Sequence, residues 1–581
     1  MKKTTALSVI LCFCISFIYT QSKIEAELLA LANSSPQVEA IIIFKEQAEL
    51  SLAKGIQNKA TKGSYVFQSL KQVANRSQKT VRTLLQNAQI DFQTLLIVNA
   101  IHAKLDLQML NQIAAQPEVL RIQQNPVGVV QELRPARSNN YGRDLVEWGV
   151  EMIGATQVWE MGYRGQGVVV GGQDTGVEWD HNAIKEQYRG WNGEQVDHNY
   201  NWHDAIHDIS HLHDPPGSNP CGLDSTIPCD DNNHGTYITG IMLGDDGGSN
   251  QIGVAPEAKW IAARSMERGW GSLYTYLECF QWFLAPTDLN NENPDPSKAP
   301  HVINNSWSCP KIEGCYLKNW DILELAINNL RAAGIVVVVS AGNTDPICGE
   351  IKTPSAIFEG SFTIGASDDV DTLGNFSSAG PVLVDHSRRL KPNVVAPGVN
   401  VRSARRDGLY LTASGTSAAG PYVAGLVALM ISANPSLAGQ VDVIETIIEE
   451  SAIPLYWEEN CDEFLGEVHP NTFYRYGRID AVAAVEQALL LTSTEEVAPS
   501  NQLKVFPNPF SDLLFFELQN WKQEVQLQLV QADGKLILNR TFQPEEVHFI
   551  SVPVKNLSSG LYFYRLQSQT QLQTGKLFKS E

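Results

Sequence analysis

A tight turn followed by a long apolar segment is the feature that most constrains how this chain can fold. The turn runs from Gly415 to Pro421, and residues 422–430 after it are apolar. A segment without a polar face predicts a helix buried on all sides, which requires a large domain around it. Ser417 then lies at the helix N-terminus, where unpaired N–H groups favour negative charge, so it is a candidate acylated nucleophile. A capping hydroxyl at an ordinary loop-to-helix junction is the alternative.

Length and charge limit the classes of protein and partner. A chain of 581 residues is too long for one hydrophobic core, so several domains are expected. Its 43 basic and 64 acidic side chains give a formal net charge of −21, which disfavours phosphate backbones and anionic membranes. We therefore expect no nucleic-acid partner.

The N-terminus has the pattern of a secretory signal. Lys2 and Lys3 precede an apolar segment at 6–19, which is shorter than the roughly 20 residues that a membrane helix needs. We expect residues 1–22 to be a signal peptide, and a retained anchor is the alternative.

Seven cysteines follow the signal, all in the central region. Export permits disulfides, and Cys221 with Cys229 and Cys309 with Cys315 are close enough in sequence to bridge locally. Because seven is odd, at least one thiol stays free or pairs between molecules. The other pairings stay open. The cysteines lack paired C-x-x-C spacing, so a zinc site is not expected.

Residues 23–137 predict a small α+β domain without cysteine. An apolar stripe between Val66 and Leu85 predicts a long helix. A shorter helix is predicted at 107–115, and strands are predicted at 38–44, 95–98, 100–103 and 119–122. The polar, proline-containing residues 133–140 predict an exposed, cleavable linker.

Residues 138–491 alternate apolar strand-like segments with helical patterns, which predicts an α/β domain. Continuous apolar segments typical of buried parallel strands occur at 168–170, 260–263, 302–303 and 335–339. The insertion at 188–231 is rich in His, Asp, Pro and Gly and is expected to be a solvated surface loop. A metal site at its His203, His207, His211 and His213 is the less favoured alternative.

Three further motifs lie beside predicted strand ends or helix starts. Asp174-Thr175-Gly176 follows a strand, His234-Gly235-Thr236 opens a helix, and Asn343 lies on the turn after the strand at 335–339. Open α/β sheets build their sites at such strand ends. An aspartic protease needs two Asp-Thr-Gly motifs, and this chain has one. The order Asp, His, Ser therefore favours a serine nucleophile with a base and an orienting carboxylate.

These motifs resemble those of the subtilisin-like serine proteases, peptidase family S8. The resemblance extends to residues 253–256, 305–307, 341–343, 376–378, 391–393, 396–398 and 476–480. Residues 200–204 and 282–286 look most like the bacillopeptidase F branch. The resemblance implies an α/β, parallel-sheet, three-layer catalytic domain.

It also implies roles for the matched residues: Ser417 as nucleophile, His234 as base, Asp174 as the group that orients His234, and Asn343 as oxyanion donor. Ser306, Trp307 and Ser308 match the family's substrate-pairing segment, and for Trp307 a packed aromatic is the alternative. No cofactor is implied for the chemistry. Calcium is common in the family, but its ligands and any other metal ligand are unknown here.

Three positions depart from the family pattern. Tyr237 stands where histidine is usual, Ala418 where methionine is usual, and Gly420 where alanine is usual. None of the three removes a catalytic group.

The small α+β domain at 23–137 resembles the inhibitory propeptide of these proteases. Such a domain folds against the active site and leaves its tail in the substrate groove. The resemblance predicts cleavage between Val130 and Asn140 during maturation.

Residues 492–502 predict a polar linker, and residues 503–581 predict a small all-β sandwich domain. The segments 505–509, 560–563 and 575–577 resemble the C-terminal sorting domain of type IX secretion. This implies contact with the outer-membrane secretion machinery of a Gram-negative bacterium, and release or surface attachment. A carbohydrate- or protein-binding β-module is the alternative.

The sequence therefore predicts a secreted, monomeric serine endopeptidase that acts on protein or peptide substrates. It would be made as a precursor inhibited by its own propeptide. A catalytically silent surface adhesin on the same fold and a sugar-binding enzyme are the competing hypotheses. The complete set of catalytic residues disfavours the first, and the lack of a clear aromatic platform in the C-terminal module weakens the second.

Overall fold

The computed structural model describes residues 23–125, 127–130, 134–135, 146–209, 218–308 and 319–491, and most of 505–579. One compact unit contains residues up to Leu50 and Gln57–Thr492, and a second contains Ser51–Ile56 and Ser493–Glu581. The predicted signal peptide, the Cys309–Cys315 bridge and the linker at 492–502 lie outside the described residues. The domain boundaries stay predictions.

The N-terminal domain is built on an antiparallel sheet of order β2-β3-β1-β4. Its elements are α2 (Ala26–Ser34), β1 (Val38–Phe44), α3 (Lys59–Ser77), α4 (Lys79–Asn87), β2 (Phe92–Leu95), β3 (Ala100–Leu105), α5 (Leu107–Ala114) and β4 (Val119–Gln124). The predicted long helix is divided at Gln78, whose buried side-chain amide donates to the Ala100 carbonyl at 3.2 Å.

The strand predicted at 95–98 was wrong beyond Leu95. Leu96–Val98 form a short 3₁₀ turn in which Ile97 and Val98 are both fully buried. A strand would place two consecutive side chains on opposite faces, whereas the turn buries both. Asn99 closes it with a φ of 44°.

The central domain contains a seven-stranded sheet of order β16-β15-β14-β12-β7-β9-β8 in which every neighbouring pair is parallel. Its strands are β7 (Val169–Asp174), β8 (Trp202–Asp204), β9 (Lys259–Arg264), β12 (Val302–Asn305), β14 (Val336–Ser340), β15 (Phe362–Ser367) and β16 (Val394–Pro397). The predicted apolar strands are confirmed, and nearly all of their residues are buried because helices cover both faces of the sheet.

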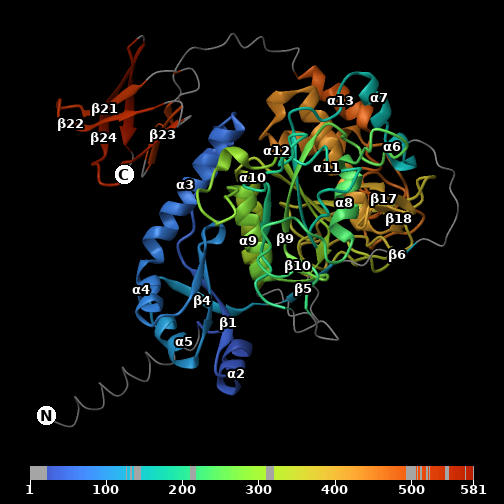
Figure 1. Ribbon diagram of the computed structural model, residues 1–581, viewed down its shortest axis with the longest axis horizontal. Helices are drawn as coiled ribbons and strands as arrows, with labels where there is room; N and C mark the ends of the chain where they lie inside the picture. The colour runs from blue at the N-terminus through green and yellow to red at the C-terminus, as the bar shows by residue number, and fades with distance from the viewer. Residues whose placement is uncertain are drawn as a thin grey trace. The chain divides into compact units, whose positions relative to one another are not determined.

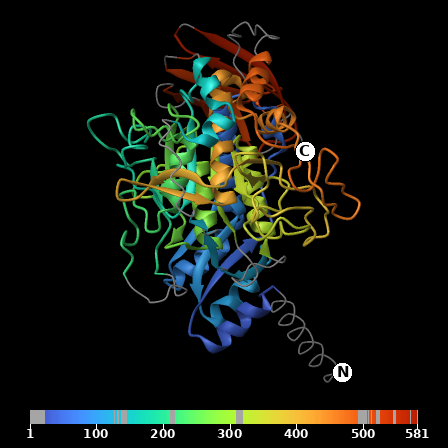
Figure 2. The same cartoon turned by 90° about the vertical axis from the view of Figure 1, so that its right-hand side faces the viewer.

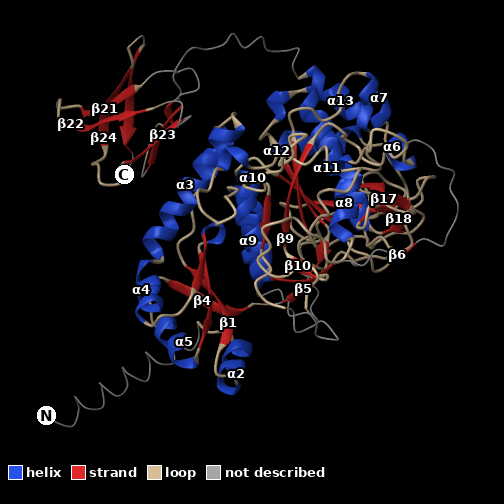
Figure 3. Cartoon of the chain, viewed as in Figure 1, coloured by secondary structure: helices blue, strands red, loops and turns tan. Residues whose placement is uncertain are grey.

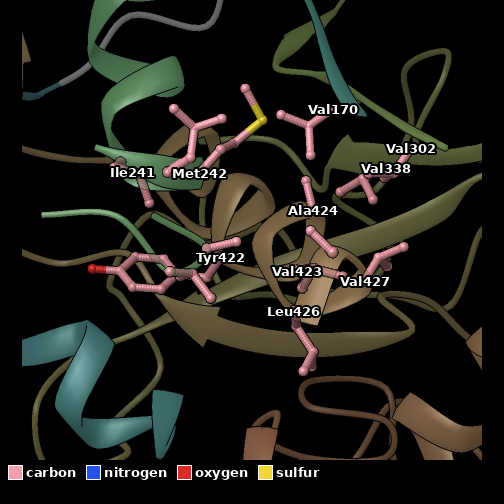
Figure 4. Close-up of a cluster of buried hydrophobic side chains, with 14 of the residues drawn as sticks. Val170, Ile241, Met242, Val302, Val338, Tyr422, Val423, Ala424, Leu426 and Val427 are labelled. Atoms are coloured by element: carbon pink, nitrogen blue, oxygen red, sulfur yellow. The ribbon is translucent and has the colours of Figure 1, made fainter. Parts of the chain in front are cut away.

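Helices form a layer on each side of this sheet, so the domain has the predicted three layers (Figure 3). The helices are α6 (Trp148–Met152), α7 (Ala155–Glu160), α8 (His234–Leu243), α9 (Leu273–Leu284), α10 (Asp321–Ala332), α11 (Thr416–Ala433), α12 (Val441–Ser451) and α13 (Ala481–Leu490). Val170, Val302 and Val338 face α8 and α11, as Figure 4 shows. On the other face, Phe283 of α9 lies against Gly171.

The central helix α11 is the buried helix that the apolar segment predicted. By length and composition it could cross a membrane, but 94% of it is buried inside the domain, which identifies it as a core helix. Helix α8 and the sheet pack around it. It is this burial that fixes the position of Ser417 at its N-terminus.

The expectation that 188–231 is a solvated loop was wrong at Trp202–Asp204. These residues form β8, the buried edge strand of the main sheet. A charged residue can lie there because Arg264 donates to both carboxylate oxygens of Asp204, at 2.8 and 2.7 Å.

Two disulfides lie among the described residues. The predicted bridge between Cys221 and Cys229 is confirmed, and Cys279 is free and buried, which agrees with the expectation of at least one thiol without a partner in the chain. The second bridge joins Cys348 to Cys461 across a separation of 113 residues. Local spacing could not have indicated that pair.

Replacing Cys348 and Cys461 together with alanine should lower the free energy of unfolding by roughly 4 kcal/mol, because the bridge closes a long loop in the unfolded chain. Guanidinium unfolding of a Ser417→Ala background measures this without self-digestion. The matched control, Cys221→Ala with Cys229→Ala, opens a short loop and should cost less. If removing the Cys221–Cys229 bridge lowered the free energy of unfolding more, the explanation by loop-closure entropy would be contradicted.

Two small sheets flank the main one. The first has the order β10-β11-β5-β13, from β10 (Met266–Glu267), β11 (Trp270–Ser272), β5 (Val127–Val130) and β13 (Trp307–Ser308). The second has the order β17-β18-β6, from β17 (Val401–Arg405), β18 (Leu409–Ser414) and β6 (Arg134–Pro135). Part of the predicted exposed linker is therefore a strand, because Arg134 and Pro135 pair with β18.

The elements described in residues 505–579 are all strands, as predicted (Figure 1). One sheet has the order β19-β20-β23 and the other β22-β21-β24-β25. The strands are β19 (Val505–Phe506), β20 (Leu513–Glu517), β21 (Val525–Gln531), β22 (Leu536–Phe542), β23 (Phe549–Pro553), β24 (Gly560–Gln567) and β25 (Leu572–Lys579). Apolar residues of both sheets, such as Leu514 and Leu527, share one core, which gives a sandwich.

Candidate active site

Three neighbouring strands of the main sheet deliver side chains to one edge. Strand β7 ends at Asp174, β12 leads into Ser306, and β14 leads into the turn that carries Asn343. Because β14, β12 and β7 are adjacent and parallel, their carboxyl ends lie together. Residues far apart in the sequence are thus brought to one place, beside the N-terminus of α11.

Asp174 and His234 form a buried pair. Asp174 Oδ1 lies 2.7 Å from His234 Nδ1, and both residues are almost fully buried. Since the carboxylate accepts from Nδ1, the proton is placed on Nδ1 and the other ring nitrogen can act as a base. His234 Nε2 has no hydrogen-bond partner among the described residues.

A second carboxylate, Asp230, joins the two segments that carry this pair. Thr175 Oγ1 donates to Asp230 Oδ1 at 2.9 Å, and Thr236 donates to Oδ2 from its backbone N–H at 2.9 Å and from its hydroxyl at 2.6 Å. Asp230 therefore fixes the end of β7 against the start of α8. Sequence reasoning missed it, although the Asp-Asp-Asn-Asn segment directly before His234 was a usable signal.

Ser417 is fully buried in the first turn of α11. Its hydroxyl donates to the Ser306 carbonyl at 3.5 Å and forms no hydrogen bond with His234. Pro421 lies inside the helix and lacks the N–H that would donate to the Ser417 carbonyl. The Ser306 hydroxyl donates to that carbonyl instead, at 3.2 Å.

Asn343 is oriented by the helix N-terminus. Thr416 donates to Asn343 Oδ1 from its backbone N–H and from its hydroxyl, both at 2.8 Å. With its oxygen held in this way, Asn343 Nδ2 is buried and has no partner among the described residues. The arrangement leaves an amide donor free next to Ser417, as an oxyanion requires.

Replacing Asn343 with alanine should lower turnover by about 10²–10³-fold, the effect of removing the corresponding amide of subtilisin. Substrate binding should change little, because the donor acts on charge that develops only in the transition state. Steady-state kinetics on a peptide substrate separates kcat from KM. A rise in KM with unchanged kcat would contradict this role.

The substrate-segment residues lie beside this site. Trp307 is 1% exposed and stacks on Tyr276, with ring centroids 3.7 Å apart and planes at 1°. Its backbone belongs to β13 and pairs with β5. Trp307 is therefore a packed aromatic whose backbone also pairs with an extended strand.

Two of the three residues that differ from the family pattern, Tyr237 and Gly420, make contacts that explain the difference. Tyr237 donates from its hydroxyl to the Val401 carbonyl at 2.8 Å, which ties α8 to β17. A Cβ at Gly420 would lie 2.7 Å from Asn304 Oδ1. Glycine there leaves room for Asn304, whose amide donates to the Ser306 hydroxyl at 2.9 Å.

Two histidines of the insertion bind a carboxylate. His203 and His207 both hydrogen bond to the partly buried Glu278, each at 2.9 Å, while His211 and His213 lie outside the described residues. Although burial opposes the charge, Glu278 and Asp224 raise the pKa of His207 to about 9. Within the described residues no group of His, Cys, Asp or Glu is arranged to hold a metal.

Comparison with known proteins decides the family. Residues 165–477 match the subtilase family, and residues 504–580 match the secretion system C-terminal sorting domain. The first match covers more than half of the chain. The chain belongs to the subtilase family. Subtilases as a family need no cofactor for their catalysis. Its C-terminal domain marks this subtilase for type IX secretion, to the medium or the cell surface.

Relatives of this subtilase are themselves proteases. Bacillopeptidase F of Bacillus subtilis is 36% identical over 483 residues, which cover 79% of this chain and 31% of that protein. Serine protease AprX of the same organism is 33% identical over 236 residues, 36% of this chain and 51% of that protein. The chain thus spans about a third of the length of bacillopeptidase F and about half of the length of AprX. This bears out the bacillopeptidase F resemblance.

A solved structure supports the fold. A mutant of the epidermin leader peptide processing serine protease from Staphylococcus aureus superimposes with a TM-score of 0.53 at 16% identity. The match covers 78% of this chain and 99% of that one. The subtilisin-like arrangement of the central sheet and helices is therefore confirmed.

Proposed function

We propose that the chain is a secreted serine endopeptidase that cleaves proteins through an acyl-enzyme on Ser417. The observation that carries this proposal is the meeting of Asp174, His234, Asn343 and Ser417 at one edge of the sheet. Asp174 is hydrogen bonded to His234, Thr416 orients Asn343, and the family match supplies the reaction class. Protein substrates and the secretion machinery are the proposed partners of a monomeric enzyme.

In the proposed reaction, Ser417 Oγ attacks a peptide carbonyl while His234 Nε2 takes its proton. Asp174 stabilises the imidazolium through Nδ1, and Asn343 Nδ2 donates to the oxyanion. His234 then protonates the leaving amine, and water repeats the cycle on the ester. The Ser417 hydroxyl must turn from the Ser306 carbonyl toward His234, a rotation expected on substrate binding.

We further propose that the N-terminal domain is an inhibitory propeptide. Strand β5 lies between β11 and β13, where Trp307 pairs with Val130 and Gly271 with Gly128. Strand β6 pairs with β18 immediately before the nucleophile turn, Ser414 with Arg134. The chain thus occupies both sides of Ser417, as a bound substrate would.

The N-terminal domain, which is blue in Figure 2, contacts α9, α10 and their neighbours, and these contacts support the same role. Asn329 donates to the Ile97 carbonyl at 2.6 Å, and the Tyr274 backbone donates to Asn125 Oδ1 at 2.9 Å. Lys59 donates to the Ala299 carbonyl at 2.9 Å, and its burial lowers its pKa to about 7. These contacts hold the domain beside the occupied groove.

The proposed maturation cut falls within residues 131–133, between β5 and β6. This narrows the interval from Val130 to Asn140 that the sequence predicted. N-terminal sequencing of the secreted protein locates the cut. If Ser417→Ala protein from the native host were already cut there without added protease, self-processing would be wrong.

Labelling with a fluorophosphonate tests the proposed activity against the alternative of a silent adhesin. The processed protein should be labelled at Ser417 and should digest casein, because an intact triad activates that hydroxyl. Peptide mapping by mass spectrometry identifies the labelled residue. An adhesin would neither be labelled there nor digest casein. A structural calcium ion stays a prediction without assigned ligands.

A further inference from the structure

Two stacked aromatic rings lie beside the slot between β11 and β13 that strand β5 occupies. Tyr276 of α9 stacks flat on Trp307, and both are almost fully buried. A Cβ added to Gly271 would lie 2.5 Å from Tyr276 Oη and 2.7 Å from its Cζ. The Tyr276 ring therefore lies against the backbone of β11 and leaves no space for a side chain at position 271.

Strand register defines which substrate position faces these rings. Directly paired residues of antiparallel strands lie on the same face, and alternate residues of one strand share a face. Gly128 pairs with Gly271 and Val130 with Trp307, so all four positions lie on one face. Gly271 and Trp307 are buried, whereas Trp270 and Ser308 of the opposite face are partly exposed. Position 128 thus lies on the same face as Gly271, which is the face that the Tyr276 ring contacts.

We propose that Tyr276 and Trp307 form a closed aromatic floor that restricts the substrate position opposite Gly271 to glycine. This assigns a specificity-determining role to Tyr276 and a substrate class to the site: extended segments with glycine at that position. The inference rests on the proposed function, because it concerns the same groove. The chain's own segment satisfies the rule, since Gly128 lies opposite Gly271.

Self-processing of the full chain tests the floor directly. Gly128→Leu should slow the appearance of the cut product by about tenfold or more, the penalty expected when a side chain is forced into a filled site. The matched control, Val129→Leu, changes the next residue of the same strand, which the register assigns to the opposite face, and should process within about twofold of the parent. Parent-rate processing of Gly128→Leu would overturn the inference.

Removing the Tyr276 ring should restore the processing rate of the slow Gly128→Leu variant. Tyr276→Ala in the Gly128→Leu background should recover most of the parent rate, and Tyr276→Leu is the second variant, since it keeps an apolar side chain in the core. Fluorophosphonate labelling shows that each variant retains its site. A labelled double variant that stays slow would assign the glycine requirement to backbone conformation and overturn the role of the rings.

Peptides extend the test to substrates. The processed protein should cleave Val-Gly-Val-Val-Gln-Glu at least tenfold faster, in kcat/KM, than the peptide with leucine at the second position. If a labelled enzyme cleaved both peptides at equal rates, the glycine restriction would be wrong, whereas the proposed function would stand. A parent chain that is neither labelled nor processed would overturn the proposed function, and the inference with it.

Discussion

Replacing Ser417 with alanine is expected to lower kcat by about 10⁶-fold, as loss of the nucleophile does in subtilisin. The residual rate comes from substrate binding and from the Asn343 donor, which the substitution leaves in place. The fold should persist, because Ser417 contributes only a 3.5 Å hydrogen bond to Ser306 from its side chain. The rate of casein digestion and the extent of fluorophosphonate labelling measure the effect.

The matched control is Ser432→Ala in the same helix. Ser432 bonds back to the Leu429 carbonyl at 2.7 Å and lies away from the sheet edge, so its loss should leave turnover unchanged. The Ser417→Ala chain should also accumulate uncut in a host that lacks related proteases. Equal labelling of Ser417→Ala and the parent would place the nucleophile elsewhere and end the proposed mechanism.

The second large effect is expected from Asp174→Asn. An amide cannot act as the carboxylate acceptor for His234 Nδ1, and its N–H₂ group would favour the tautomer that carries the proton on Nε2. That tautomer cannot take the Ser417 proton, so kcat should fall by about 10⁴-fold near neutral pH. Shape is preserved, so thermal unfolding should change little by comparison.

The exposed Asp180→Asn, also a loss of one carboxylate, serves as control for the change in net charge. Its kcat should match that of the parent. Steady-state kinetics and circular dichroism on all three proteins separate catalysis from folding. An Asp174→Asn enzyme that retained a tenth of the parent kcat would show that His234 needs no carboxylate partner.

The candidate catalytic residues could be picked out in the sequence because each lies in a short motif with its own local signal. Asp174, His234 and Ser417 stand at a strand end or a helix start, and those positions follow from hydrophobic patterning. The main strands were predictable for the same reason: segments such as Val336–Ser340 are continuously apolar. Local chemistry and local structure agree at these sites.

Features that depend on distant pairing could not be predicted. Strand β8 contains Trp202, His203 and Asp204, a mixture typical of loops, and it is a strand because Arg264 pairs with Asp204. The Cys348–Cys461 bridge and the placement of β5 between β11 and β13 likewise join segments far apart in the sequence. The Asp230 network could have been predicted, since Asp230 adjoins the His234 motif in the sequence.

Because β5 and β6 belong to the same chain as the strands they pair with, occupancy of the groove does not depend on protein concentration. As the proposed intramolecular inhibitor, the tail would act at an effective concentration set by its tether, which for short connections reaches the millimolar range. The proposed cut between the two strands would turn this tethered strand into a free ligand. Latency would then give way to activity on dilution, so the activity of the cut protein should depend on its concentration.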